Sequence, residues 1–173
     1  MKFIYTILAV GVLVACQPTA ETTDNSATEA FEKNSKTVMT YLEGFQNESI
    51  DYAALVSKDY LDVTTNFDSK IDSTDYDAMI ENDKGLWSMY DFKLEIGPGG
   101  LLPGVNVDTK LADGSVRYYG DWTVTLPATD STEAKTGLLS AYSSFEFDEE
   151  GKIASSQFFG DVSGLMQYLN SSE

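Results

Sequence analysis

The side chains of this 173-residue sequence that could do chemistry are carboxylates, tyrosines and hydroxyls, because the chain contains no histidine. It therefore cannot build a Ser-His-Asp or Cys-His nucleophile, and it lacks the commonest zinc ligand. Asp161 is the carboxylate of most interest. In the last expected strand every second residue points to the same face of the sheet, and counting from Ile153 through Phe159 places Asp161 on the inner face. We therefore expect Asp161 to lean toward the mouth of a pocket there.

Asp161 has two possible roles. In an apolar cleft it could act as an acid/base group, with the Tyr118 hydroxyl donating to a developing enolate, because proton abstraction beside a carbonyl needs one base and one oxyanion donor. It also directly precedes the helix expected over residues 162–169, so it could serve only as the N-cap of that helix. We keep Asp161 as the candidate catalytic residue.

A set of aromatic and polar side chains is expected on the inward faces of the strands, where it could line an apolar pocket with a few polar tips. The alternative is that these aromatic residues are ordinary core. The candidate ligand-binding residues are Tyr90, Tyr118, Trp122, Phe145, Gln157 and Phe159.

The sequence predicts neither a metal site nor a cofactor. Residues 68–83 are dense in carboxylates, but they lack the glycine and the terminal glutamate of a calcium-binding EF-hand loop. Acidic residues at the start of a helix explain Asp75 and Asp77, because the helix dipole favours negative charge there. We therefore expect a solvated helix start at these two residues.

The charge of the chain argues against nucleic acid as a partner. Twenty-eight acidic side chains face 11 basic ones, which gives a formal net charge of -17. Such a chain repels a phosphate backbone, and its basic residues form no stripe.

The N-terminus resembles a bacterial lipoprotein signal. Lys2 precedes an apolar run from Phe3 to Val14 that is too short to span a bilayer, and the only cysteine of the chain, Cys16, follows Ala15. We expect a signal peptide over residues 1–15, acylation of Cys16, and a flexible tether to residue 28. The alternative is a plain signal peptide with a coincidental cysteine. This interpretation predicts a protein anchored in the bacterial cell envelope by lipid alone.

Residues 29–173 have the pattern of one α+β domain. Helices are expected over 29–46 with a capping box at Ser26 and Glu29, over 51–56, and from Ser73 or Thr74 to 87. The expected strands are 59–65, 90–96, 105–111, 116–126, 138–147 and 152–159, with a loop over 97–104, a hairpin turn at Asp113-Gly114 and a final helix over 162–169.

From about residue 29 to residue 169 the chain resembles the SnoaL-like branch of the NTF2-like superfamily. This resemblance implies a cone, in which N-terminal helices and a strongly bent antiparallel sheet enclose a pocket. The superfamily includes cyclases, isomerases, dehydratases and non-catalytic domains, and a homodimer formed through sheet surfaces is plausible by the same resemblance. The matching segments are Asp113-Gly114, YYGDWT at 118–123, FEF at 145–147, GKI at 151–153, Asp161 and GLM at 164–166.

Three functions are compatible with these observations. The preferred one is binding of a small, largely apolar molecule in the pocket of a lipid-anchored envelope protein. The second is an enzyme of cyclase, isomerase or dehydratase type that uses Asp161. The third is an envelope interaction module that uses the outer sheet surface around Tyr119 and Asp121.

Acylation can be tested directly. Cells fed an alkyne fatty acid should label the protein, and Cys16→Ser should abolish the label because it removes the thiol that would be acylated. An unlabelled wild-type protein would rule out the lipoprotein interpretation.

Overall fold

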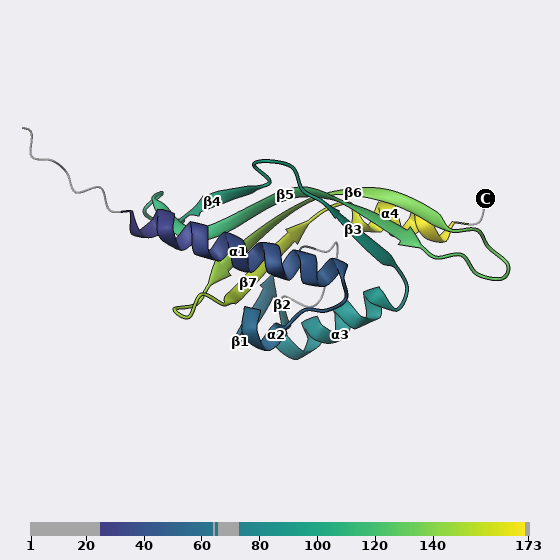
Figure 1. Cartoon of the computed structure of the whole chain (residues 1–173), viewed down its shortest axis with the longest axis horizontal. Coiled ribbons are helices and arrows are strands. Elements are labelled where there is room, and N and C mark those ends of the chain that lie inside the picture. The colour runs from purple at the N-terminus through teal and green to yellow at the C-terminus, as the bar shows by residue number, and fades with distance from the viewer. Residues whose placement is uncertain (1–24, 64, 66–72, 172–173) are drawn as a thin grey trace, which may run out of the picture.

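A computed structural model of the chain describes residues 25–63, 65 and 73–171, and Figure 1 shows their arrangement. Cys16 and residues 17–24 of the expected tether lie outside the described residues, whereas residues 26–28, also expected in the tether, form the first turn of α1. The elements are α1 (Ser26–Gln46), α2 (Tyr52–Leu55), β1 (Val56–Val63), β2 (Ser73–Asp75), α3 (Tyr76–Trp87), β3 (Asp91–Glu95), β4 (Leu101–Val105), β5 (Ala112–Leu126), β6 (Lys135–Phe147), β7 (Ile153–Phe159) and α4 (Val162–Asn170).

The strands form one bent sheet in the order β2-β1-β7-β6-β5-β3, with β4 also paired to β5. Helices pack against its concave side: α1 lies under β5 and β3, α3 lies beside β1, and α4 packs on β6 (Figure 1). The predicted α+β architecture is thus confirmed. One pairing differs from the expected antiparallel sheet, because β1 and β7 run parallel.

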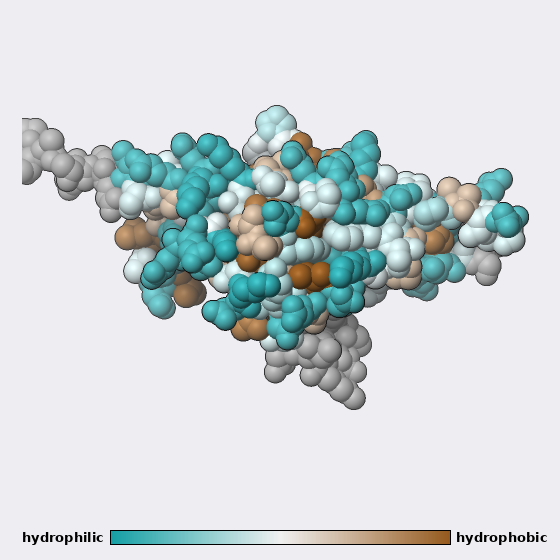
Figure 2. All heavy atoms as spheres, turned by 60° about the horizontal axis from the view of Figure 1, so that its bottom comes forward, coloured by the Kyte–Doolittle hydropathy of each residue, from teal (hydrophilic) through white to brown (hydrophobic). Residues whose placement is uncertain are grey.

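The inward faces of β5 and β6 carry the core, as the period-two pattern predicts. Val116, Tyr118, Trp122 and Val124 of β5 are buried, and Phe145 of β6 lies among them. Figure 2 shows the outer surface on the side where the helices lie. Most residues there are hydrophilic, and the hydrophobic ones form small separate spots. Apolar burial is therefore concentrated between the sheet and the helices.

Helix α1 presents Asn34, Val38 and Leu42 to the interior, each one turn after the last. Asn34 is buried, and its side-chain amide donates a hydrogen bond of 2.9 Å to the backbone oxygen of Gly114. This bond satisfies the polar residue of the buried stripe and ties α1 to β5.

The hairpin expected at Asp113-Gly114 is wrong, because these residues lie within β5 and the turn falls earlier. Asn106 makes that turn: its side-chain oxygen accepts bonds of 3.0 Å from the backbone N–H groups of Asp108 and Thr109. Val107 is 74% exposed, so the expected strand over residues 105–111 is wrong as well, and β4 occupies part of the expected loop instead. The apolar alternation there was coincidental.

Two helix starts also differ from expectation. The N-cap of α1 is Asn25 rather than Ser26, and the N-cap of α3 is Asp75, whose carboxylate accepts a bond of 2.9 Å from the backbone N–H of Ala78. Asp75 therefore acts as a cap and not merely as a first-turn charge.

Gly114→Ala should destabilise the fold. Gly114 has a φ of +82°, and an added Cβ would lie 2.6 Å from the Cβ of Ala30 on α1. We expect the free energy of unfolding in urea to fall by about 1–3 kcal/mol. Gly85→Ala in α3 is the matched control, since a Cβ there meets nothing within 4 Å, and it should raise stability by about 0.5–1 kcal/mol. Equal effects of the two substitutions would contradict this account.

Candidate functional site

A cavity of about 360 Å³ lies between the concave face of the sheet and helices α1, α3 and α4. Most of its wall is apolar. Close contacts between aromatic rings build part of that wall: the ring of Phe45 on α1 lies 4.9 Å from that of Phe92 and 5.5 Å from that of Trp122. Edge-to-face packing of this kind gives a rigid wall.

Tyr118 lines the cavity from β5 with its side chain fully buried. In the described part of the chain, three buried side-chain polar atoms have no hydrogen-bond partner, at Ser35, Trp87 and Tyr118, and only Tyr118 lines the cavity. Burial, with a smaller effect of the Asp121 charge, raises the pKa of the Tyr118 phenol to about 12, so it remains a proton donor. The cavity therefore contains an unused donor.

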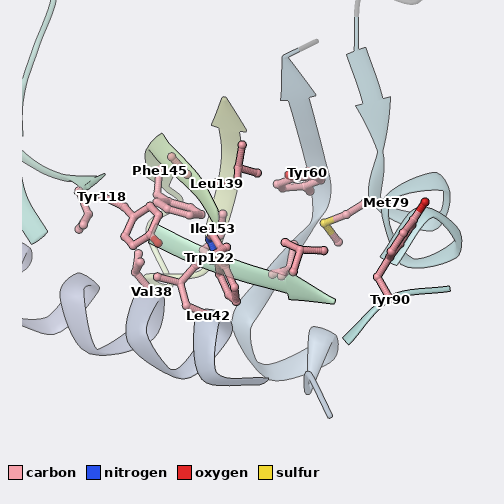
Figure 3. Packing of buried hydrophobic residues seen from close by; sticks show 14 of the residues in the cluster. Val38, Leu42, Tyr60, Met79, Tyr90, Tyr118, Trp122, Leu139, Phe145 and Ile153 are labelled. Carbon is pink, nitrogen blue, oxygen red and sulfur yellow. The ribbon is translucent and has the colours of Figure 1, made fainter. Parts of the chain in front are cut away.

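Gly120 provides the space for Tyr118 to take this position. A Cβ at Gly120 would lie 2.6 Å from the Tyr118 hydroxyl oxygen. The tyrosine ring can therefore lie along β5 over the glycine, rather than projecting straight into the cavity (Figure 3). The two residues are on the same face of the strand, as their spacing requires.

Asp83 of α3 lies on the cavity wall and is 8% exposed. The hydroxyl of Tyr52 donates a hydrogen bond of 2.8 Å to its Oδ2. Burial raises the pKa of Asp83 to about 6; the Tyr52 bond opposes this rise and the nearby Asp62 charge adds to it. Asp83 can therefore exchange a proton close to neutral pH.

Asp62 at the end of β1 is the second carboxylate of the cavity. The hydroxyl of Ser156 lies 3.3 Å from Asp62 Oδ1 and 2.7 Å from the hydroxyl oxygen of Tyr60. Burial raises the pKa of Asp62, and the Ser156 bond partly offsets this. We call the set Tyr52, Tyr60, Asp62, Asp83 and Ser156 the acidic end of the cavity.

In the part of the chain that the structure describes, no group of three acidic, cysteine or histidine side chains is placed to hold an ion. Among the same residues, no helix has the length and apolarity needed to cross a membrane.

Of the sequence-predicted ligand-binding residues, Tyr118, Trp122 and Phe145 meet at the cavity wall (Figure 3). Tyr90 is buried but lies outside this wall, where its hydroxyl accepts a bond of 3.0 Å from the side-chain amide of Asn170. Tyr90 thus joins the start of β3 to the end of α4.

Gln157 and Phe159 point away from the cavity, and their expected inward orientation is wrong. Glu146 pairs with Ser155 but Phe147 pairs with Ile153, so Ala154 is an extra residue that reverses the parity of β7. Ser156 and Phe158 line the cavity instead. Phe159 is 47% exposed on the other face of the sheet.

Asp161 lies outside the cavity, exposed at the start of α4. Its Oδ1 accepts a hydrogen bond of 2.9 Å from the backbone N–H of Gly164, so it caps the helix. The catalytic role of Asp161 stays a prediction, and the carboxylates that line the cavity are those of Asp62 and Asp83.

The acidic end was not predicted from the sequence, although the sequence contains one signal for Asp83. Tyr76, Met79 and Asp83 follow each other at helical spacing and are the buried residues of α3. This places Asp83 on the inner face of the helix, apart from the solvated carboxylates around it. Its partner Tyr52 comes from α2, a contact that no local pattern reveals.

No protein-family model matches the chain, and no curated protein matches it. Solved structures do. A proposed polyketide cyclase from Xanthomonas campestris pv. campestris superposes with a TM-score of 0.61 at 13% identity, covering 82% of this chain and 99% of that one. An NTF2-like protein from Burkholderia xenovorans LB400 gives a TM-score of 0.55 at 14% identity, with coverage of 80% and 97%.

This chain has the NTF2-like fold. A proposed SnoaL-like polyketide cyclase from Shewanella denitrificans OS-217 aligns over 80% of this chain and 98% of its own length, with a TM-score of 0.56 and 13% identity. The NTF2-like fold with SnoaL-like neighbours agrees with the resemblance found in the sequence, and at these identities the likeness concerns the fold alone.

Asp83→Asn should stabilise the protein at neutral pH. The folded-state pKa of Asp83, raised to about 6 by burial, lies above its unfolded value, so its contribution to stability is present at low pH and is lost as the pH rises through 6. We expect the variant to exceed the wild type by about 2 kcal/mol at pH 7.5 in urea unfolding, and the difference to close toward pH 4. Asp91→Asn, at an exposed position, is the control. A difference that does not change with pH would contradict the buried charge.

Proposed function

We propose that this domain binds a small, largely apolar molecule in its cavity, and that acylated Cys16 holds the domain at a membrane of the bacterial cell envelope. The observation that carries the proposal is Tyr118, a residue of the cavity wall whose buried hydroxyl has no partner in the described part of the chain. A buried hydroxyl without a partner costs about 1–3 kcal/mol, and a ligand acceptor bound there would recover that energy.

The shape and composition of the cavity support the same function. Its volume of about 360 Å³ suits a small molecule. Aromatic and aliphatic side chains make up most of the wall. Its hydroxyl, amide and carboxylate groups come from Tyr41, Tyr60, Asp62, Thr65, Thr74, Asn82, Asp83, Tyr118, Ser143 and Ser156. Such a wall binds by apolar burial and orients its ligand through few hydrogen bonds.

An acid/base enzyme is the second candidate. The observation that favours it is Asp83, a buried carboxylate with its pKa raised to about 6 in the wall of a largely apolar cavity. Two of the similar structures are described as proposed polyketide cyclases, which agrees with such chemistry. If a turnover assay is found, Asp83→Asn should lower the rate. Asp161→Asn should lower the rate only if Asp161 is catalytic, as the sequence predicts.

Binding can be tested by filling the cavity. Ser143 of β6 is buried and lines the cavity, so Ser143→Phe should occupy the space a ligand needs. Native mass spectrometry of the full-length protein, after exposure to a lipophilic extract of its source cells, should show a retained small mass that Ser143→Phe loses.

Ser140→Phe is the matched control, because it adds the same side chain at an exposed position of the same strand. It should retain the small mass. A wild-type protein with no added mass would count against the binding function and favour the interaction module on the outer sheet face. That face carries the adjacent rings of Tyr119, Tyr142 and Phe159.

A further inference from the structure

We propose that the ligand of this cavity is an organic amine, with an apolar body against the aromatic wall and an ammonium group held by Asp62 and Asp83. This inference rests on the proposed binding function and specifies the chemical class of its ligand. Neither the fold nor the similar structures point to an amine. The acidic end of the cavity is the feature that points to one.

Two carboxylates from separate elements, β1 and α3, line the same cavity. Among the described residues each has one side-chain donor, Ser156 for Asp62 and Tyr52 for Asp83. An ionised carboxylate can accept about four hydrogen bonds. Both groups therefore have acceptor capacity left over, and an ammonium group brings three donors.

No lysine or arginine is among the residues that line the cavity in the described part of the chain. The ion pairs recorded there lie elsewhere, as in Arg117 with Glu146 at 3.0 Å and Lys93 with Glu95 at 3.1 Å. Lys58, on the same strand as Asp62, lies 3.7 Å over the ring of Tyr76. Buried charges in proteins are normally paired, yet among the described residues neither buried Asp83 nor half-buried Asp62 has a cationic partner.

The raised pKa values of Asp62 and Asp83 have burial as their main cause, as expected for carboxylates that lack a cation. A bound ammonium would lower both values and favour the charged form. A carboxylate or phosphate ligand would instead meet two like charges. The cavity thus selects against anions and favours cations.

The aromatic residues around the acidic end suit an ammonium as well. Tyr60 belongs to that end, and Tyr41, Phe45 and Phe158 line the same cavity. Ring faces attract cations, and the attraction strengthens when water is excluded. In Figure 3, Tyr60 and Met79 lie to one side of Trp122 and Tyr118 lies to the other.

Tyr118 supplies an independent sign of a ligand. Tyr118 lines the cavity, and its buried hydroxyl, which lies over Gly120, has no partner among the described residues. A second polar atom on the ligand, able to accept a hydrogen bond, would satisfy it. We therefore expect amines that also carry an ether, hydroxyl or carbonyl oxygen to bind better than simple ones.

Three probes with the same carbon skeleton separate the effect of charge on affinity from that of the apolar body. They are 4-phenylbutylamine, 4-phenylbutan-1-ol and 4-phenylbutyrate. Isothermal titration calorimetry on the full-length protein at pH 7.5 should show the amine binding at least about tenfold more tightly than the alcohol, and the butyrate binding most weakly. Asp62→Asn and Asp83→Asn should each reduce the preference for the amine over the alcohol. Asp91→Asn removes one negative charge at an exposed position and should leave the preference unchanged.

The outcomes separate this inference from the function on which it rests. Equal affinity for amine and alcohol would overturn the amine inference while leaving apolar binding in place. Binding of none of the three probes would count against both. An amine preference that persists in both aspartate variants, shown to be folded by circular dichroism, would also overturn it, because the selectivity would then come from net charge.

Discussion

The concave face of the bent sheet has to be covered, because its inward side chains are mostly large and apolar. Helix α1 covers β5 and β3 through Val38 and Leu42, and α3 and α4 approach β1 and β6. These helices leave a space of about 360 Å³ among them. The bend of the sheet and the positions of three helices thus create the cavity, and its chemistry depends on which side chains face it.

Two features of that cavity each cost the empty protein free energy of folding. Among the described residues, the buried hydroxyl of Tyr118 has no partner, and neither the buried carboxylate of Asp83 nor the half-buried carboxylate of Asp62 has a cation beside it. Each arrangement lowers the stability of the empty protein. Natural chains tolerate such costs mainly where function requires them, so we interpret these three groups as parts of one binding site.

The period-two pattern of β5 and the helical spacing of α1 allowed the layers and the inward positions of Tyr118 and Trp122 to be predicted, because both patterns are local. β7 could not be predicted in the same way. The extra residue Ala154 depends on pairing with β6, and it moves Ser156 rather than Gln157 to the cavity. Asp83 and its partner Tyr52 are 31 residues apart, so only the folded chain brings them together.

The parallel pairing of β1 with β7 has a consequence for how the protein acquires its site. Asp62 and Ser156 are 94 residues apart, and Tyr60 and Ser156 are 96 apart, so these contacts close some of the longest loops in the domain. Contacts of such separation form slowly, because the entropy of loop closure must be overcome first. The β5–β6 hairpin and the ring contacts of Phe45, Phe92 and Trp122 involve no residue of β1. We therefore expect an apolar hollow to form early in folding, and the acidic end, with any selectivity for charge, to appear only when the two distant strands meet.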